Sequence, residues 1–272
     1  MRFGVCTWVF GGAPLQQIAA DLASIGYDGM ELMGDLAAHP AAEVRSVCES
    51  TGLSVLSLTP ENEDLAHPDE ATRQKARDYY RRLVDFAHEI GCPLVSCHGA
   101  VGRVRALSTQ EQEYGWLRDG VAALAESAQA AGIKVAMEVL NRYESHLLNT
   151  AAQAIEFVRQ VNHPSVGILL DAYHMNIEEA NPARALETAG DRLFIFHVAD
   201  SNREGIGRGH TDFVALAAAL RRIGYAGDVI VECTATGPDP FTPIKGDGWQ
   251  AQLETYLAES LAYLRRDSRL SH

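Results

Sequence analysis

The chain is built from short apolar runs that alternate, from one end to the other, with longer amphipathic stretches. This alternation is typical of repeated β-α units, in which helices cover a sheet of parallel strands. Eight units can be counted, the number that closes a (β/α)8 TIM barrel. The predicted strands are 2–8, 28–32, 53–59, 93–98, 133–138, 166–171, 193–197 and 228–232.

Glycine marks the point where several predicted helices give way to the next strand. Gly26, Gly52, Gly91, Gly132 and Gly224 each lie where a helix commonly ends on a left-handed residue. No change of composition marks a linker, so the sequence predicts a single domain, 1–272. Its active site is expected at the C-terminal ends of the strands. A doubly wound open sheet is the alternative architecture.

Composition narrows the partners and the compartment. The formal net charge is -13 and the 23 basic residues are scattered, which argues against a nucleic-acid partner. Five cysteines show neither the count nor the spacing of a disulfide framework, so we expect reduced and mostly buried thiols. We find no signal peptide and no apolar run that could span a membrane, and we therefore expect a cytoplasmic protein.

Ionisable residues end four consecutive predicted strands, at Glu138, Asp171, His197 and Glu232. Within a parallel strand buried on both faces such a group is costly, whereas at the strand end it reaches the loops. Taken singly, each is more often a side chain paired with a nearby lysine or arginine. Four in register on one rim favour a metal site instead. Three carboxylates and one imidazole suit Mn²⁺, Mg²⁺ or Co²⁺.

The surrounding residues resemble a known family. The runs 138–150 and 171–179, and then His197, Asn202-Arg203, Gly207, Gly209 and Glu232, are similar to the D-tagatose 3-epimerase (D-psicose or D-allulose 3-epimerase) family of ketose 3-epimerases. That family lies within the xylose isomerase-like TIM barrel superfamily. The resemblance is dense from about residue 133 onward, and the first half shares only the general barrel pattern.

The resemblance implies an isomerase of carbohydrate metabolism that acts on a free ketohexose or ketopentose. One divalent ion, Mn²⁺ first and Co²⁺ or Mg²⁺ as alternatives, would be held by Glu138, Asp171, His197 and Glu232. The ion would stabilise a cis-enediolate when the C3 proton leaves. Glu138 and Glu232 would be the catalytic acid and base, one taking the proton and the other returning it to the opposite face.

Three further residues are implied to bind the sugar, and each has a simpler interpretation. His174, in a loop after Asp171, would hydrogen-bond a substrate oxygen or else cap the next helix. Arg203 would bind a hydroxyl or else lie exposed at the rim. Glu144 would bind a hydroxyl, orient His174, or pair with Arg142.

Several loops bear on the substrate. The glycine-rich segment 205–210 lacks a lysine, so we interpret it as a tight loop near a free sugar rather than a phosphate site. Trp8 and Trp249 could form an apolar wall or belong to the core. The loop 99–105 is compact and basic, and its Arg103 and Arg105 leave room for an anionic substrate.

Alternative functions stay open at this level. The same metal site would serve an aldose-ketose or hydroxypyruvate-type isomerase, an inosose lyase, or an epimerase of a phosphorylated or acidic sugar. A barrel that only binds sugar is disfavoured, because binding gains little from two opposed carboxylates. From the resemblance we expect a homodimer or homotetramer, with no nucleic-acid or membrane partner.

Overall fold

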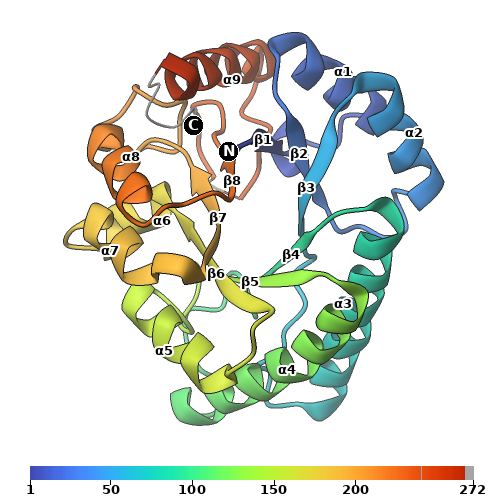
Figure 1. Cartoon of the computed structure of the whole chain (residues 1–272), viewed down its shortest axis with the longest axis vertical. Coiled ribbons are helices and arrows are strands. Elements are labelled where there is room, and N and C mark those ends of the chain that lie inside the picture. The colour runs from blue at the N-terminus through green and yellow to red at the C-terminus, as the bar shows by residue number, and fades with distance from the viewer. Residues whose placement is uncertain (240, 267–272) are drawn as a thin grey trace.

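The chain forms a closed barrel of parallel strands in a computed structural model that describes residues 1–239 and 241–266 (Figure 1). Each strand pairs with the next along the chain, and β8 pairs with β1. The strands are β1 (Phe3–Cys6), β2 (Gly29–Met33), β3 (Ser54–Thr59), β4 (Leu94–Cys97), β5 (Lys134–Glu138), β6 (Val166–Asp171), β7 (Leu193–Val198) and β8 (Asp228–Val231). The predicted (β/α)8 barrel is confirmed, and the open sheet is wrong.

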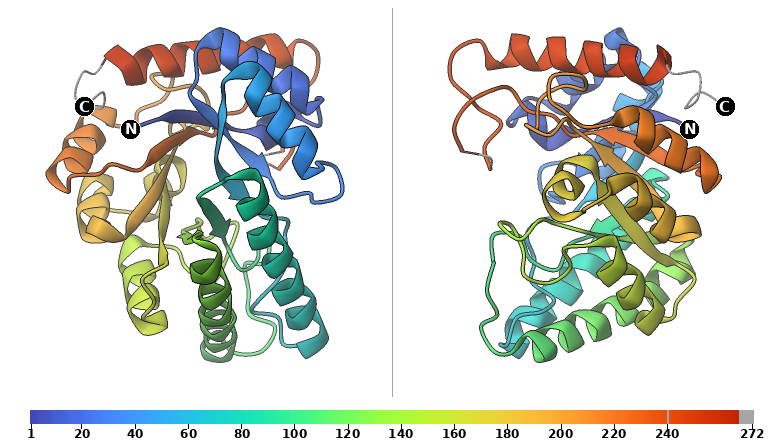
Figure 2. Two further views of the ribbon diagram at one scale, coloured as in Figure 1. Left: turned by 45° about the vertical axis from the view of Figure 1, so that its right-hand side comes forward. Right: turned by 90° about the vertical axis from the view of Figure 1, so that its left-hand side faces the viewer.

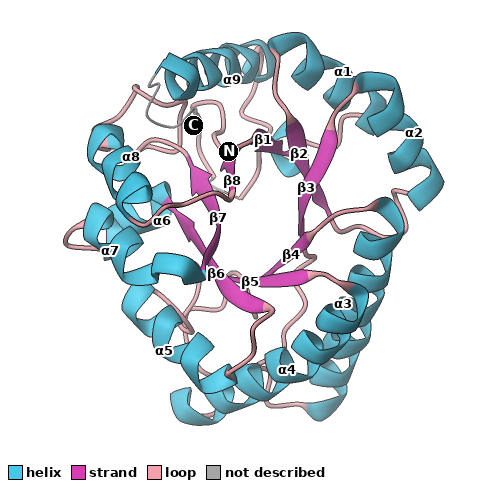
Figure 3. Ribbon diagram, in the orientation of Figure 1, coloured by secondary structure: helices cyan, strands magenta, loops and turns pink. Residues whose placement is uncertain are grey.

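Helices surround this ring on its outer side (Figure 3). They are α1 (Leu15–Ile25), α2 (Ala41–Thr51), α3 (Glu70–Ile90), α4 (Gln110–Ala131), α5 (Ala151–Val161), α6 (Ala172–Glu178), α7 (Pro182–Ala189), α8 (Phe213–Arg222) and α9 (Trp249–Arg266). The 3-10 helices η1 (Thr7–Phe10) and η2 (Gly190–Arg192) follow β1 and precede β7. In both views of Figure 2, α9 lies beside α1.

The predicted strands agree with the observed ones within two residues at each end. The largest difference is at the first strand, where β1 ends at Cys6 and the backbone turns into η1 before Trp8. The glycines predicted to end helices all have φ between 64° and 101°, a conformation that other residues rarely adopt. These caps are Gly26, Gly52, Gly91, Gly132 and Gly224.

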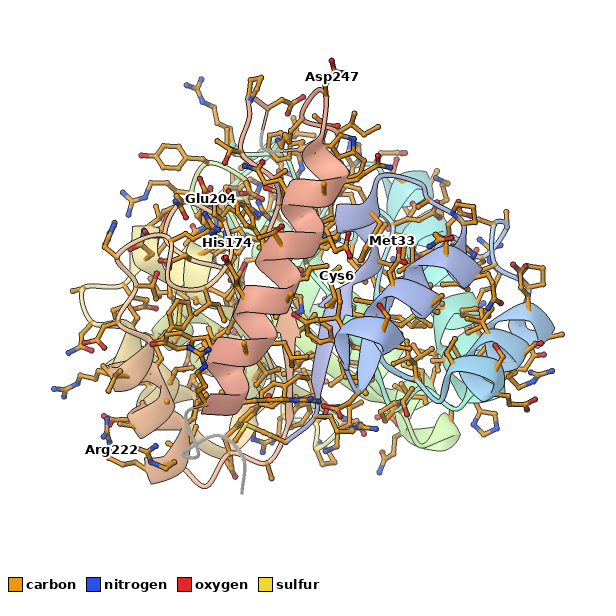
Figure 4. All side chains as sticks on the ribbon, turned by 90° about the horizontal axis from the view of Figure 1, so that it is seen from above. Cys6, Met33, His174, Glu204, Arg222 and Asp247 are labelled. Carbon is orange, nitrogen blue, oxygen red and sulfur yellow. The ribbon has the colours of Figure 1, made fainter. Side chains whose placement is uncertain are left out.

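Two apolar clusters hold the barrel together. Side chains from the strands alone fill the interior, among them Leu56, Leu169, Ile195 and Ile230, all at most 1% exposed. A larger cluster lies between the strands and the helices. Because the interior is packed, polar chemistry is confined to the strand ends. In Figure 4, His174 and Met33 lie toward the end that carries Asp247, and Arg222 lies at the opposite end.

Two expectations from composition can be compared with this fold. All five cysteines are free, and four of them are buried. In the ranges 1–239 and 241–266, the helices are too short or too polar for any of them to cross a bilayer.

Candidate active site

A cavity of about 560 Å³ lies at the C-terminal ends of the strands, where barrel enzymes carry their active sites. Its walls come from both halves of the chain. The lining residues are Trp8, Gly11, Gly12, Met33, Thr59, Pro60, Asn62, His98, Val101, Glu138, Leu140, Glu144, His174, His197, Arg203, Glu232, Phe241 and Pro243. All the residues predicted to hold the metal or the sugar are among them except Asp171.

Three of the four predicted metal ligands meet in this cavity. Glu138 ends β5, His197 is the second-last residue of β7, and Glu232 directly follows β8. One ligand atom from each can be chosen so that all lie within 4.8 Å of one another. Nδ1 of His197 is 3.5 Å from Oε2 of Glu232. All three residues are at most 8% exposed.

Asp171 lies beside this group but outside it. It ends β6, is 1% exposed, and is in register with His197 across the β6-β7 pair. Its Oδ1 accepts a hydrogen bond from the amide of Tyr173 and so caps α6. Its Oδ2 is 3.7 Å from Nε2 of His174. One oxygen is thus committed to the helix, and the other is free to bind a cation.

The donor atoms fit a divalent cation. Oδ2 of Asp171, Nδ1 of His197 and Oε2 of Glu232 are buried, yet none has a hydrogen-bond partner among the described residues. Buried polar atoms normally have partners, so three orphans at one place indicate a group that binds them together. Oxygen donors with one imidazole match Mn²⁺, Co²⁺ or Mg²⁺.

The pKa values in the site point the same way. Burial, and then the neighbouring acidic side chains, raise the pKa of Glu138 to about 8 and that of Asp171 to about 7. Burial would also raise the pKa of Glu232, but contacts with His197, Arg203 and Trp8 hold it well below its usual range. Carboxyl groups this crowded are ionised together only when a cation is present.

His174 is buried and neutral, because burial lowers its pKa to about 3. Its Nδ1 accepts hydrogen bonds from the backbone and side-chain amides of Asn141, at 3.3 and 2.8 Å. Asn141 also donates to Glu144, so Glu144 orients His174 through it. With Nδ1 accepting, Nε2 carries the hydrogen and can donate to a substrate oxygen. His174 lies in α6 rather than in the predicted loop.

Arg203 is buried, not exposed at the rim. Its guanidinium is 3.5 Å from Glu232 and 3.7 Å from Glu144, between the rings of Trp8 and Tyr173. Trp8 donates to Glu232 at 2.6 Å. The cavity therefore has one permanent cation among its carboxylates, positioned by two aromatic faces.

The basic residues thought to leave room for an anionic substrate do not line the cavity. Arg103 pairs with Asp64 and Glu113, and Arg105 is exposed at a distance from the lining. Arg142 pairs with Glu178, which rules out the pairing with Glu144 that the sequence left open.

The glycine-rich segment 205–210 and the residues on either side of it fold around the carboxylate of Asp200. Asp200 accepts hydrogen bonds from the amides of Ser201, Gly207 and Thr211, at 2.7 to 3.1 Å. The amide of Gly207, which could have bound a phosphate, is thereby occupied, which agrees with the interpretation against phosphate. The expectation that this segment approaches the substrate is wrong, because none of its residues lines the cavity. Trp249 also lies outside the lining and packs on Gly11.

The sequence analysis missed a histidine and a glutamate at or next to the site, as well as the polar lining residues Thr59 and Asn62. His98 follows β4, lines the cavity, and has a buried Nδ1 with no hydrogen-bond partner among the described residues. Glu31 lies in β2, is fully buried, and is 3.1 Å from Nε2 of His197. The signal for Glu31 was its place inside an apolar strand, where an ionised side chain requires a partner.

Comparison with known proteins identifies the family of the chain. The family model for the xylose isomerase-like TIM barrel matches residues 19–266. The chain is 32% identical over 226 residues to the D-psicose 3-epimerase of Ruminiclostridium cellulolyticum, covering 78% of this chain and 75% of that one. It is 31% identical over 227 residues to the 3-dehydro-D-guloside 4-epimerase of Escherichia coli, covering 80% and 87%.

A solved structure adds to these relatives. A D-psicose 3-epimerase determined in the presence of D-fructose superposes with a TM-score of 0.90 at 26% identity, with all of both chains covered. The relatives named here are epimerases, which are isomerase-class enzymes. The chain therefore belongs to the xylose isomerase-like TIM barrel family, among the sugar epimerases that include the ketose 3-epimerases.

Proposed function

We propose that this protein is a metal-dependent ketose 3-epimerase, formed by one domain, 1–272, with its active site at the C-terminal ends of the strands. The observation that carries the proposal is the buried group of Glu138, His197 and Glu232 at the cavity, with orphaned ligand atoms. Asp171 would be the fourth ligand through its free Oδ2. A divalent ion held there would polarise the ketone and the neighbouring hydroxyl and stabilise the charge of an enediolate.

The two glutamates would carry the proton. Glu232 lies 3.5 Å from the guanidinium of Arg203 and accepts a hydrogen bond from Trp8, so it is suited to take the C3 proton as a base. Glu138, at the end of β5, would deliver a proton to the other face. A proton removed from one face and returned to the other inverts the carbon. The roles exchange in the reverse direction.

The remaining residues would bind and orient the sugar. The Nε2 hydrogen of His174 would be donated to an oxygen beside the reacting carbon, and Arg203 would bind a hydroxyl with its positive charge. Glu144 would fix both, because it contacts Arg203 and reaches His174 through Asn141.

The test is deuterium exchange from heavy water into a panel of free ketoses, with Mn²⁺-loaded protein and NMR to locate the label. We expect label at C3 and formation of the C3 epimer. In Glu138→Gln and Glu232→Gln, turnover should fall by at least about 1000-fold, because each removes a proton carrier. Turnover that survives in both variants would contradict the mechanism.

A matched control is Glu204→Gln. Glu204 accepts hydrogen bonds from Thr236 and Tyr256 and does not line the cavity, so turnover should be unchanged. Label at C1 or C2 with an aldose product would instead identify an aldose-ketose isomerase.

A second candidate is a 4-epimerase of 3-keto glycosides, as the name of the Escherichia coli relative suggests. The chain covers more of that relative than of the D-psicose 3-epimerase, 87% against 75%. Label at C4 of a 3-keto glycoside, with none in free ketoses, would favour this candidate.

Mn²⁺ is the proposed ion, with Co²⁺ and Mg²⁺ as alternatives, and a free sugar is the proposed substrate. Cytoplasmic location and a homodimer or homotetramer stay predictions. Metal analysis of protein purified without added ions would test the identity of the ion. Light scattering would test the oligomeric state.

A further inference from the structure

Glu31 is a fully buried carboxylate in the interior of the barrel. It does not line the cavity, yet several polar groups surround its two oxygens. Ser57 donates to Oε2 at 2.5 Å, Thr59 donates to Oε1 at 2.6 Å, and the thiol of Cys6 lies 3.5 Å from Oε1. Nε2 of His197 is 3.1 Å from Oε2. Four side chains from three other strands thus converge on one carboxylate.

The directions of these hydrogen bonds can be worked out. Ser57 donates its hydroxyl hydrogen to Oε2 of Glu31 and Thr59 donates its own to Oε1, so both carboxylate oxygens act as acceptors. It follows that Nε2 of His197 carries a hydrogen and donates it to Glu31.

This hydrogen bond sets which ring nitrogen of His197 has a free lone pair at the candidate metal site. A neutral imidazole carries one hydrogen, so with Nε2 protonated the lone pair is on Nδ1. Nδ1 is the nitrogen that lies 3.5 Å from Glu232 and has no hydrogen-bond partner among the described residues. The interior of the barrel thus sets the form in which His197 can bind a cation.

We infer that Glu31 is a positioning residue that holds His197 with Nδ1 toward the metal and strengthens metal binding from outside the ligand set. The inference rests on the proposed metal site. A carboxylate behind a ligating histidine fixes the ring and raises its basicity. A purely packing role would not need an ion here, since apolar side chains such as Leu56 and Leu169 fill other positions of the barrel interior.

The test is the affinity for Mn²⁺, measured by electron paramagnetic resonance of the free ion, with no sugar present. In Glu31→Met the acceptor is lost, and we expect roughly 10- to 100-fold weaker binding. Glu31→Gln keeps an oxygen that can accept from Nε2, and it should restore most of the affinity. The visible spectrum of bound Co²⁺ should change in Glu31→Met and stay close to wild type in Glu31→Gln.

Ser96→Ala is the matched control. Ser96 is a buried barrel serine in β4 that donates to the carbonyl of Leu58 and, among the described residues, forms no hydrogen bond with Glu31 or His197, so Mn²⁺ affinity should be unchanged. If Glu31→Met does not fold, Glu31→Asp replaces it, because it keeps the charge but withdraws the carboxylate by one methylene. Wild-type affinity in the folded Met or Asp variant would overturn the inference.

Other outcomes separate the inference from the function. Equal losses in Glu31→Gln and Glu31→Met would show that charge alone matters and would overturn a positioning role. Failure of the wild-type protein to bind Mn²⁺, Co²⁺ or Mg²⁺ would refute the proposed metal site itself. Metal binding without turnover of any ketose would leave the inference intact and refute the epimerase.

Discussion

Arg203 combines an unusual backbone with a demanding set of side-chain contacts. Its φ is +62°, a left-handed conformation that costs a non-glycine residue about 1 kcal/mol or more. The conformation is held by its amide, which donates to Asp200, and by its carbonyl, which accepts from Thr234. Strain of this kind is commonly found where a side chain must be aimed precisely.

We therefore predict that Arg203→Lys lowers kcat/KM for the ketose substrate by about 100-fold, because an ammonium group cannot contact Glu144 and Glu232 while stacking on two rings. Steady-state kinetics measures the loss, and thermal unfolding checks the fold. Arg208→Lys is the control, since Arg208 pairs with Glu259 on the surface of the same loop region. A threefold effect or less in Arg203→Lys would mean that only its charge is used.

At the scale of single residues, the sequence reveals functional side chains at the ends of strands but not those in the middle of a strand. Glu138, Asp171, His197 and Glu232 could be found because an ionisable residue ended each apolar run. Glu31 has the same chemistry, but it lies in the middle of β2, and its partner His197 is 166 positions away. Only closure of the barrel brings them together.

Among the elements, the connection from β4 to α4 is fixed by one buried carboxylate. Glu113 in α4 has a fully buried side chain and accepts from Arg103 and from the amides of Leu107 and Ser108. The residues that looked basic and exposed in the sequence thus help to shape a rigid loop. The sequence could not show this, because the pairing depends on the loop conformation.

We predict that Glu113→Gln destabilises the protein by about 2 kcal/mol at pH 7. The positive charge of Arg103 would then face a neutral amide instead of the carboxylate that now balances it. Burial opposes ionisation of Glu113, but its hydrogen bonds lower the folded pKa below 4.5. Its contribution is therefore complete above the unfolded pKa and is lost as the pH falls through the folded value. Urea unfolding of both proteins should show a constant difference from pH 7 to about pH 5, and a difference that shrinks as the pH falls below 4.5 toward about pH 2. A difference that stays constant over the acidic range would contradict the assignment.

The pairing of β2 and β3 depends on Gly29. A Cβ at this position would come within 3.0 Å of the Ser54 carbonyl and of the Leu56 side chain. We predict that Gly29→Ala destabilises the barrel by about 1–3 kcal/mol, because the two backbones would have to separate. Differential scanning calorimetry measures the change.

The control for this change is Gly115→Ala in α4, where a Cβ meets nothing within 4 Å. There alanine should stabilise by up to about 1 kcal/mol, because it is the better helix former. If Gly29→Ala were equally harmless, the observed β2-β3 spacing would be wrong.

For the whole molecule, the concentration of carboxylates at one end of the barrel predicts that metal binding stabilises the fold. A ligand that binds only the folded state adds about 2.7 kcal/mol at 100 times its Kd, which corresponds to roughly 5–10 °C in Tm for a chain of this size. We expect this rise with Mn²⁺ and its reversal by a chelator. His197→Ala should abolish it, and an undiminished rise in that variant would place the ion elsewhere.

The overall architecture was the most predictable level. The alternation of strands and helices, the glycine caps and the placement of the site at the strand ends all follow from local rules of periodicity and capping. The substrate was less predictable, because the walls of the cavity come partly from loop residues such as Val101, Phe241 and Pro243. Their conformations are set by contacts between distant parts of the chain.

The hydrogen bonds from Trp8 to Glu232 and from His197 to Glu31 both cross from one half of the barrel to the other. The second half of the barrel delivers the candidate ligands, whereas the first half adds Trp8 and Glu31, which hold two of them in place. The second half alone would thus contain every candidate ligand but lack these two contacts. Directed evolution for a new sugar could work mainly on the first half, whose Met33, Pro60 and Val101 line the cavity and are not candidate ligands.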